Sequence, residues 1–126
     1  MIELTVTKAF EFDSAHHLPY YEGRCKNPHG HRWRLEVTVW GILQGEGPKQ
    51  GMVVDFVDLK KVVNEKVIDV LDHQDINGLI PNPTAENMIR WIAYQLNDLG
   101  CSPIVSCCQL RLWETPDSCV TWRVVK

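Results

Sequence analysis

Strict alternation of apolar and polar residues at both ends of this chain restricts its fold more than any other feature. The N-terminal segment 2–16 places its apolar residues on even positions: Ile2, Leu4, Val6, Phe10 and Phe12. The segment after Pro28 places them on odd positions: Trp33, Leu35, Val37 and Val39. Near the C-terminus, Cys108, Leu110 and Leu112 share one parity, and Val120, Trp122 and Val124 share another. Because successive side chains of a strand point to opposite faces, these segments predict four half-buried strands.

Two helices are expected between the strand pairs. The first has Asp55 as its N-cap and carries apolar residues at helical spacing: Leu59, Val62, Val63, Val67, Val70 and Leu71. The second has Thr84 as its N-cap, ends at Gly100 and carries Met88, Ile89, Ile92, Leu96 and Leu99. The order ββααββ predicts an α+β domain, a four-stranded antiparallel sheet with two helices on one face. A length of 126 residues predicts a single domain, 1–126.

Charge and composition restrict the possible partners. A formal net charge of −3 argues against nucleic acid as a partner. No apolar run approaches the ~20 residues of a membrane helix, and the N-terminus does not resemble a signal peptide. The five cysteines form no paired pattern, so we expect reduced thiols in a cytoplasmic protein.

Four of the five histidines lie within residues 16–31. His29 and His31 continue the apolar face of their strand, with the small Gly30 between them, so both can reach one ion. His16 continues the apolar face of the first strand, whereas His17 continues its polar face. Parity therefore brings His16, His29 and His31 together on the covered face.

Three neutral nitrogen ligands without a fourth protein ligand are typical of a catalytic Zn²⁺ that keeps a position open for water or substrate. A structural zinc site usually has four ligands and cysteine pairs, and this chain has no Cys-x-x-Cys sequence. The alternative is that these histidines cluster at loop and strand ends without a metal.

Two further groups could supply acid–base chemistry. Cys25 lies in a loop near the predicted metal, between Arg24 and Lys26, which stabilise a thiolate; otherwise it is an idle surface thiol. Asp72 precedes His73 at the end of the first helix and can orient that imidazole as a proton shuttle. Capping or solvation at the helix end would also explain this pair.

Glu114 has the parity of Leu110 and Leu112, so its carboxylate faces the covered side and needs a partner there. A ligand with a guanidine-like N–H edge would provide one, and so would a neighbouring arginine. Cys107 and Cys108 lie in an apolar strand and are expected to be packing residues, while Cys101 and Cys119 give no functional signal.

Together these residues resemble the 6-pyruvoyltetrahydropterin synthase family. The matching segments occur in order along the chain: Phe12–Pro19, Cys25–His31, Leu71–His73, Pro83–Asn87 and Trp113–Thr115. The resemblance implies the tunnelling fold, in which three subunits close a barrel and two trimers form a hexamer with active sites at subunit interfaces. That assembly would cover the free edges of a four-stranded sheet.

The resemblance also implies a role for each residue. His16, His29 and His31 would bind zinc, Cys25 would act as base, and Asp72 with His73 would form its partner dyad. Glu114 would anchor the pterin ring, with Thr84 beside it and Glu86 as a further contributor. The implied substrate is 7,8-dihydroneopterin triphosphate, a small molecule whose triphosphate would need basic residues such as Arg24 or Lys26.

The three residues between Cys25 and His29 resemble the short loop of bacterial 6-carboxytetrahydropterin synthases of queuosine biosynthesis. These lyases release triphosphate and acetaldehyde from the substrate. The alternatives are the sister reaction that makes 6-pyruvoyltetrahydropterin by triphosphate elimination, a zinc hydrolase that would not need Cys25, and a pterin- or purine-binding module with a structural metal.

Overall fold

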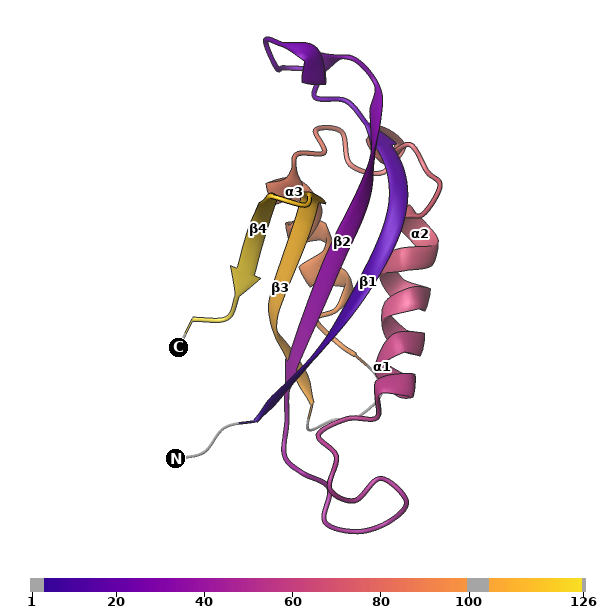
Figure 1. The fold of residues 1–126 in the computed structure, drawn as a ribbon, viewed down its shortest axis with the longest axis vertical. Coiled ribbons are helices and arrows are strands. Elements are labelled where there is room, and N and C mark those ends of the chain that lie inside the picture. The colour runs from indigo at the N-terminus through magenta and orange to yellow at the C-terminus, as the bar shows by residue number, and fades with distance from the viewer. Residues whose placement is uncertain (1–3, 100–104, 126) are drawn as a thin grey trace.

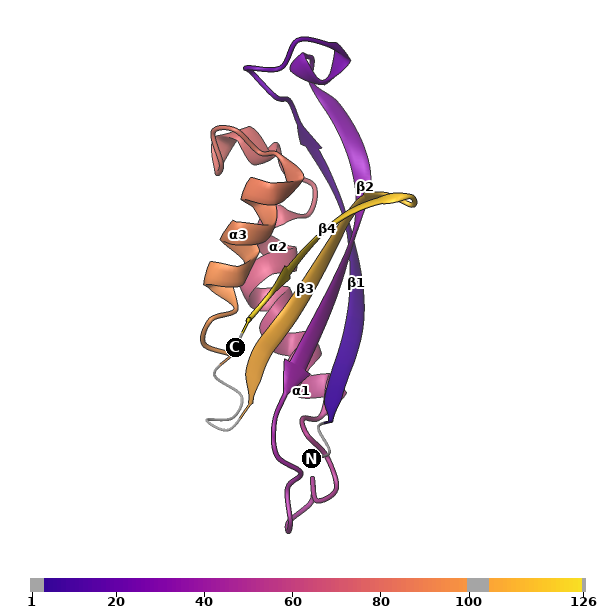
Figure 2. The same cartoon turned by 90° about the vertical axis from the view of Figure 1, so that its left-hand side faces the viewer.

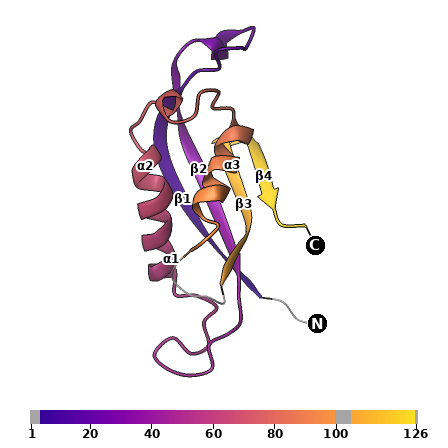
Figure 3. The ribbon, with the colours of Figure 1, turned by 180° about the vertical axis from the view of Figure 1, so that it is seen from behind.

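A computed structural model describes residues 4–99 and 105–125. Four antiparallel strands form one sheet in the order β1-β2-β3-β4: β1 Thr5–His16, β2 His29–Trp40, β3 Ser106–Thr115 and β4 Ser118–Arg123. Helix α1 (Phe56–Val63), a π-helical turn (Asn64–Ile68), α2 (Asp69–Leu71) and α3 (Ala85–Gln95) cover one face of the sheet (Figure 1, Figure 3). The expected α+β order with both helices on one face is confirmed.

The core lies between the sheet and the helices, and the side view separates these two layers (Figure 2). Even positions of β1 and odd positions of β2 face inward, so that Phe10 and Phe12 pack with Trp33 and Leu35. Every residue of β1 from Thr5 to His16 has a partner in β2, which places His16 opposite His29. The two strands therefore deliver their histidines to the same end of the sheet.

Both helices begin where the sequence predicts. The Asp55 side chain accepts a hydrogen bond from the Val57 amide, and the Thr84 hydroxyl accepts one from the Asn87 amide. These are N-cap contacts that satisfy amides left free at a helix start. No helix in the described ranges is long and apolar enough to cross a membrane.

The predicted helix surfaces and ends need correction. Val70 is exposed instead of buried, because the π-helical turn before it contains one more residue than an α-helical turn and rotates the positions after it; Ile68 is buried in its place. Helix α3 ends at Gln95 and not near Gly100, which lies outside the described residues.

A β-bulge separates two cysteines that were both expected to be packing residues. Strand β2 pairs Thr38 with Gln109 and Val39 with Cys107, so Cys108 is an extra residue in β3. Cys107 consequently packs against the core, and burial raises the pKa of its thiol to about 12. The inward parity predicted for Cys108 is wrong; its thiol donates to the Thr38 carbonyl instead.

Candidate metal centre and acid–base dyad

Three histidine side chains meet at the end of the β1–β2 ribbon. The ring centroids of His16 and His29 are 4.6 Å apart, those of His29 and His31 are 4.8 Å apart, and those of His16 and His31 are 5.1 Å apart. His17 is not part of this group; its amide donates to the Asn77 side chain. The structure thus brings together the three histidines that strand parity selected.

Backbone carbonyls fix the orientation of two of these rings. Nδ1 of His16 lies 2.8 Å from the Pro83 carbonyl oxygen, and Nδ1 of His29 lies 2.8 Å from that of Asn27. A carbonyl can only accept a hydrogen bond, so Nδ1 is the donor in each case. When the ring is neutral, Nε2 therefore carries a lone pair. Histidines that bind metals are commonly oriented in this way, by a hydrogen bond from the other ring nitrogen to a backbone carbonyl.

The three Nε2 atoms are buried and have no hydrogen-bond partner among the described residues. Burial lowers the pKa of His16 and of His31, which favours the neutral imidazoles that metals bind. Buried lone pairs without a donor are costly unless a cation or a bound water satisfies them. The group therefore fits a metal of the zinc type, which binds imidazole nitrogen.

A second β-bulge supplies a fourth residue. Strands β3 and β4 pair Trp113 with Cys119 and Thr115 with Ser118, which leaves Glu114 as the extra residue. Bulges re-aim side chains and are frequent beside active sites. Here the bulged residue turns toward the helix-covered face, in agreement with the inward direction that its parity predicted.

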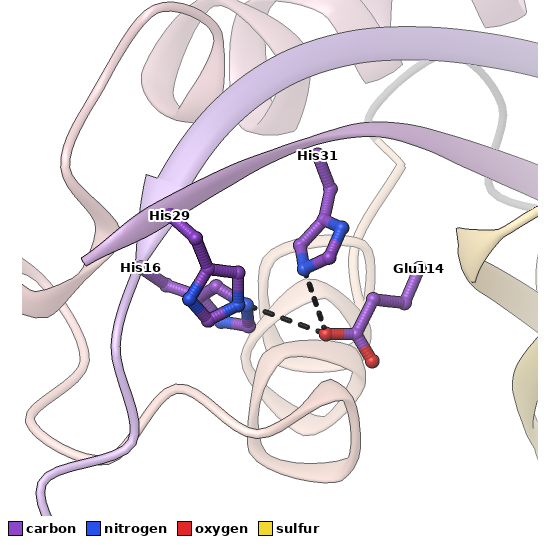
Figure 4. A group of neighbouring side chains, drawn as sticks. All are labelled: His16, His29, His31 and Glu114. Atoms are coloured by element: carbon purple, nitrogen blue, oxygen red, sulfur yellow. Dashed lines mark ion pairs between the residues drawn. The ribbon is translucent and has the colours of Figure 1, made fainter. Parts of the chain in front are cut away.

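The Glu114 carboxylate reaches the histidine group (Figure 4). Its Oε1 lies 3.3 Å from Nε2 of His16 and 3.1 Å from Nε2 of His31. The ligand atoms of His16, His29, His31 and Glu114 all lie within 4.8 Å of one another. The expectation of three nitrogens without a nearby fourth protein donor is wrong, and the side chains that face Glu114 are two imidazoles instead of an arginine.

Asp72 and His73 lie along the outer edge of β1. The Asp13 amide donates to Oδ1 of Asp72 (2.9 Å), and the His73 amide donates to the Asp13 carbonyl (2.6 Å). Further along, the Ala15 amide donates to the Gln74 carbonyl (3.0 Å). The chain after α2 therefore continues as a short partner of the edge strand that carries His16.

The dyad itself is formed. Nδ1 of His73 lies 3.0 Å from Oδ2 of Asp72, and the imidazole side chain is 78% exposed. His73 has a positive φ of 58°, a conformation that costs energy for a residue with a side chain. The hydrogen bond from the Asp13 amide, and to a lesser extent the contact with His73, lowers the pKa of Asp72. An ionised carboxylate thus orients an imidazole that is open to the outside.

Cys25 lies apart from both groups. It occupies a 3₁₀ turn, Arg24–Lys26, in the connection that projects beyond the end of the sheet (Figure 1). Its carbonyl accepts a hydrogen bond from the Leu18 amide (2.7 Å), and its thiol is free. Among the described residues, its sulfur joins neither the histidine group nor the group of Asp13, Asp72 and His73. A single chain therefore does not unite the thiol, the dyad and the histidines.

Thr84 and Glu86 lie at the start of α3. The Thr84 hydroxyl caps the helix, while Glu86 and Glu114 line a depression of ≈ 230 Å³ together with Ala85, Ser118, Cys119 and Val120. The backbone acceptors of Pro83 and Asn27 were not predicted as site residues. The sequence indicates these two acceptors only indirectly, because Pro83 is next to Thr84 and Asn27 lies two residues before His29.

Comparison with known proteins agrees with this geometry. The 6-pyruvoyl tetrahydropterin synthase family profile matches residues 5–124. A Haemophilus influenzae protein named 6-carboxy-5,6,7,8-tetrahydropterin synthase is 36% identical, over 90% of this chain and 94% of that protein. A Pyrococcus furiosus dihydroneopterin monophosphate aldolase is 39% identical over 82% of each chain. The structure of Caenorhabditis elegans 6-pyruvoyl tetrahydropterin synthase superposes with a TM-score of 0.76 at 23% identity, covering 99% of this chain and 98% of that chain.

Proposed function

This chain belongs to the 6-pyruvoyl tetrahydropterin synthase family, and from that premise we propose that it is a zinc-dependent lyase of queuosine biosynthesis. It would convert 7,8-dihydroneopterin triphosphate to 6-carboxy-5,6,7,8-tetrahydropterin, with release of acetaldehyde and triphosphate. The observation that carries this proposal is the convergence of three unpaired, buried Nε2 atoms beside the Glu114 carboxylate. A relative with the proposed activity in its name matches almost the whole chain.

His16, His29 and His31 would hold the zinc ion. When bound, zinc would supply Lewis acidity that acidifies hydroxyl groups of the substrate side chain and their neighbouring C–H bonds. The carbonyls of Pro83 and Asn27 hold the His16 and His29 rings with Nε2 inward. These residues therefore need little reorganisation to accept the ion.

Proton transfer is assigned to residues outside the histidine group. In the proposal, the Cys25 thiolate removes a proton from the substrate side chain, and His73 holds and returns protons while Asp72 orients it. Glu114 would anchor the pterin ring through its N–H edge, with Thr84 beside it and Glu86 at the rim. Orientation of this kind can contribute several kcal/mol to the lowering of the barrier.

The assembly in the proposal is a homohexamer with its sites completed between subunits. Two observations support it: His73 is largely exposed at the sheet edge, and the Cys25 sulfur is not among the grouped ligand atoms of the described part of its own chain. The cytoplasm is the proposed compartment, supported by the lack of a disulfide among the described cysteines.

The alternative function is 6-pyruvoyltetrahydropterin synthesis by triphosphate elimination alone. Both reactions would use the same residues, and the short loop between Cys25 and His29 favours the carboxy-forming branch. Incubating the zinc-loaded protein with 7,8-dihydroneopterin triphosphate and trapping volatile aldehydes separates the two. Acetaldehyde in equal amount with 6-carboxytetrahydropterin is expected; triphosphate with 6-pyruvoyltetrahydropterin and no acetaldehyde would establish the alternative. Pterin binding without any turnover would contradict both.

A further inference from the structure

The contact between Glu114 and His16 is unusual because it brings two acceptor atoms together. Nδ1 of His16 is the donor to the Pro83 carbonyl, so Nε2 of the neutral ring presents a lone pair. That lone pair faces Oε1 of Glu114 at 3.3 Å, and the contact does not qualify as a hydrogen bond. Two acceptors at this separation repel each other unless a positive charge lies between them.

The separations of Glu114 from His16 and His31 match those between two donors of a tetrahedral zinc ion. Zinc binds nitrogen and carboxylate oxygen at about 2.0–2.1 Å, so two donors of one tetrahedron lie about 3.3 Å apart. Oε1 of Glu114 lies 3.3 Å from Nε2 of His16 and 3.1 Å from Nε2 of His31. Figure 4 shows these side chains directed toward a common point from β1, β2 and β3.

From this geometry we infer that Glu114 is the fourth protein ligand of the metal in the ligand-free protein, and that it leaves the metal when a pterin enters. The exchange rests on the proposed function, in which the same carboxylate binds the N–H edge of the pterin ring. The guanidine-like N–H edge of a pterin presents two donors that pair with both carboxylate oxygens, and that pairing turns Oε1 away from the metal. Ligand binding would therefore open the metal position that the substrate side chain needs.

The surroundings of Glu114 permit such a movement. Its side chain is 30% exposed, whereas His16 is buried and held by Pro83. The depression shared with Glu86 lies beside Glu114 and provides a place for the ligand. The histidines thus form the fixed part of the coordination shell, and Glu114 forms the exchangeable part.

Cobalt substitution tests the fourth ligand without any need for turnover. Metal-free protein is titrated with Co²⁺ alone, and its visible absorption spectrum and affinity are measured for wild type, Glu114→Gln and Glu86→Gln. We expect Glu114→Gln to change the spectrum and to weaken Co²⁺ binding at least about tenfold. Glu86→Gln, on the rim of the same depression, should match wild type. Identical spectra and affinities for Glu114→Gln and wild type would overturn the inference.

The exchange is tested by adding unsubstituted pterin, which has the N–H edge but no side-chain hydroxyl to bind the metal. Its fluorescence reports binding, while the Co²⁺ spectrum reports coordination. The wild-type spectrum should change as pterin binds, and that of Glu114→Gln should not. Unchanged wild-type coordination, or no pterin binding, would overturn the exchange. Wild type that binds no Co²⁺ would also contradict the proposed function, whereas metal binding and turnover without a role of Glu114 in coordination would leave that function intact.

Discussion

The Asp13 amide donates a 2.9 Å hydrogen bond to the Asp72 carboxylate, although the two residues are 59 positions apart. In return, the Asp13 carbonyl accepts a hydrogen bond from the amide of the next residue, His73. The outer edge of β1 thereby holds the dyad while the inner face of the same strand holds His16. One strand fixes both parts of the candidate site relative to each other.

This relationship predicts a pH-dependent contribution of Asp72 to stability. The hydrogen bond from Asp13 lowers the pKa of Asp72 in the folded state below its value of about 3.9 in the unfolded chain. The contribution is therefore complete above the unfolded pKa and is lost as pH falls through the folded pKa. The difference in unfolding free energy between wild type and Asp72→Asn should be largest above about pH 5 and should narrow in acid. Urea unfolding over a pH series measures this difference, with Asp69→Asn, an exposed position on α2, as control. A difference that does not change with pH would contradict the prediction.

Ser14 connects the dyad segment to the histidine strand. Its buried hydroxyl donates to the Leu71 carbonyl, just before Asp72, and its partner in β2 is His31. Ser14→Ala should lower the free energy of unfolding by about 1 kcal/mol. The same Ser14→Ala variant should reduce kcat by a larger factor than it raises KM. His73 loses its fixed position, whereas Glu114, the proposed anchor of the substrate, is unchanged. Ser106→Ala, exposed on β3, is the matched control, and an equal kcat for both variants would argue against a positioning role.

The histidine group predicts the metal content. Wild type should be purified with one zinc per chain, and the double variant His29→Ala, His31→Ala should contain none by elemental analysis. His17→Ala, whose residue lies outside the group, should keep the metal. Chelation should also lower the Tm of wild type, since zinc bound only to the folded state stabilises it. Full zinc content in the double variant would exclude this site.

The thiol of Cys25 is predicted to be essential for turnover but not for metal binding. Cys25→Ala should lower kcat by about 10²–10⁴-fold, the range typical of a lost general base, with unchanged zinc content. Cys108→Ala, at the bulge in β3, provides the control. Full activity of Cys25→Ala would show that the thiol is a bystander and would favour a metal-bound hydroxide mechanism.

Thr84 is predicted to have two roles that can be measured separately. Because its hydroxyl caps α3, Thr84→Ala should lower the free energy of unfolding by about 1 kcal/mol. Because the proposal places Thr84 beside the substrate, Thr84→Ala should also raise KM. Thr84→Ser keeps the hydroxyl and should have the stability and the KM of wild type. An alanine variant as stable as wild type would contradict the capping role, and one with unchanged KM would remove Thr84 from the substrate site.

Local patterns in the sequence were sufficient for the fold and for the choice of histidines. The period of two in β1 and β2 predicted which faces are buried, and it selected His16 over His17 because a strand alternates its side chains strictly. Helix starts were equally predictable, since the contacts of Asp55 and Thr84 involve amides only two or three residues away. Such features depend on neighbours in the chain.

Features that depend on distant residues were not predictable. The π-helical turn that exposes Val70 and the bulge that leaves Cys107, and not Cys108, against the core arise from packing and from pairing with β2. The contact of Glu114 with two imidazoles needed the register of β3 against β2 and a bulge against β4. Chain periodicity determined that three histidines and one carboxylate face inward. Periodicity also predicted that the three histidines converge. Only the tertiary structure decided that Glu114 joins them, that Pro83 orients His16 and that β1 holds Asp72, because these contacts join residues that are distant in sequence and adjacent only in the folded chain.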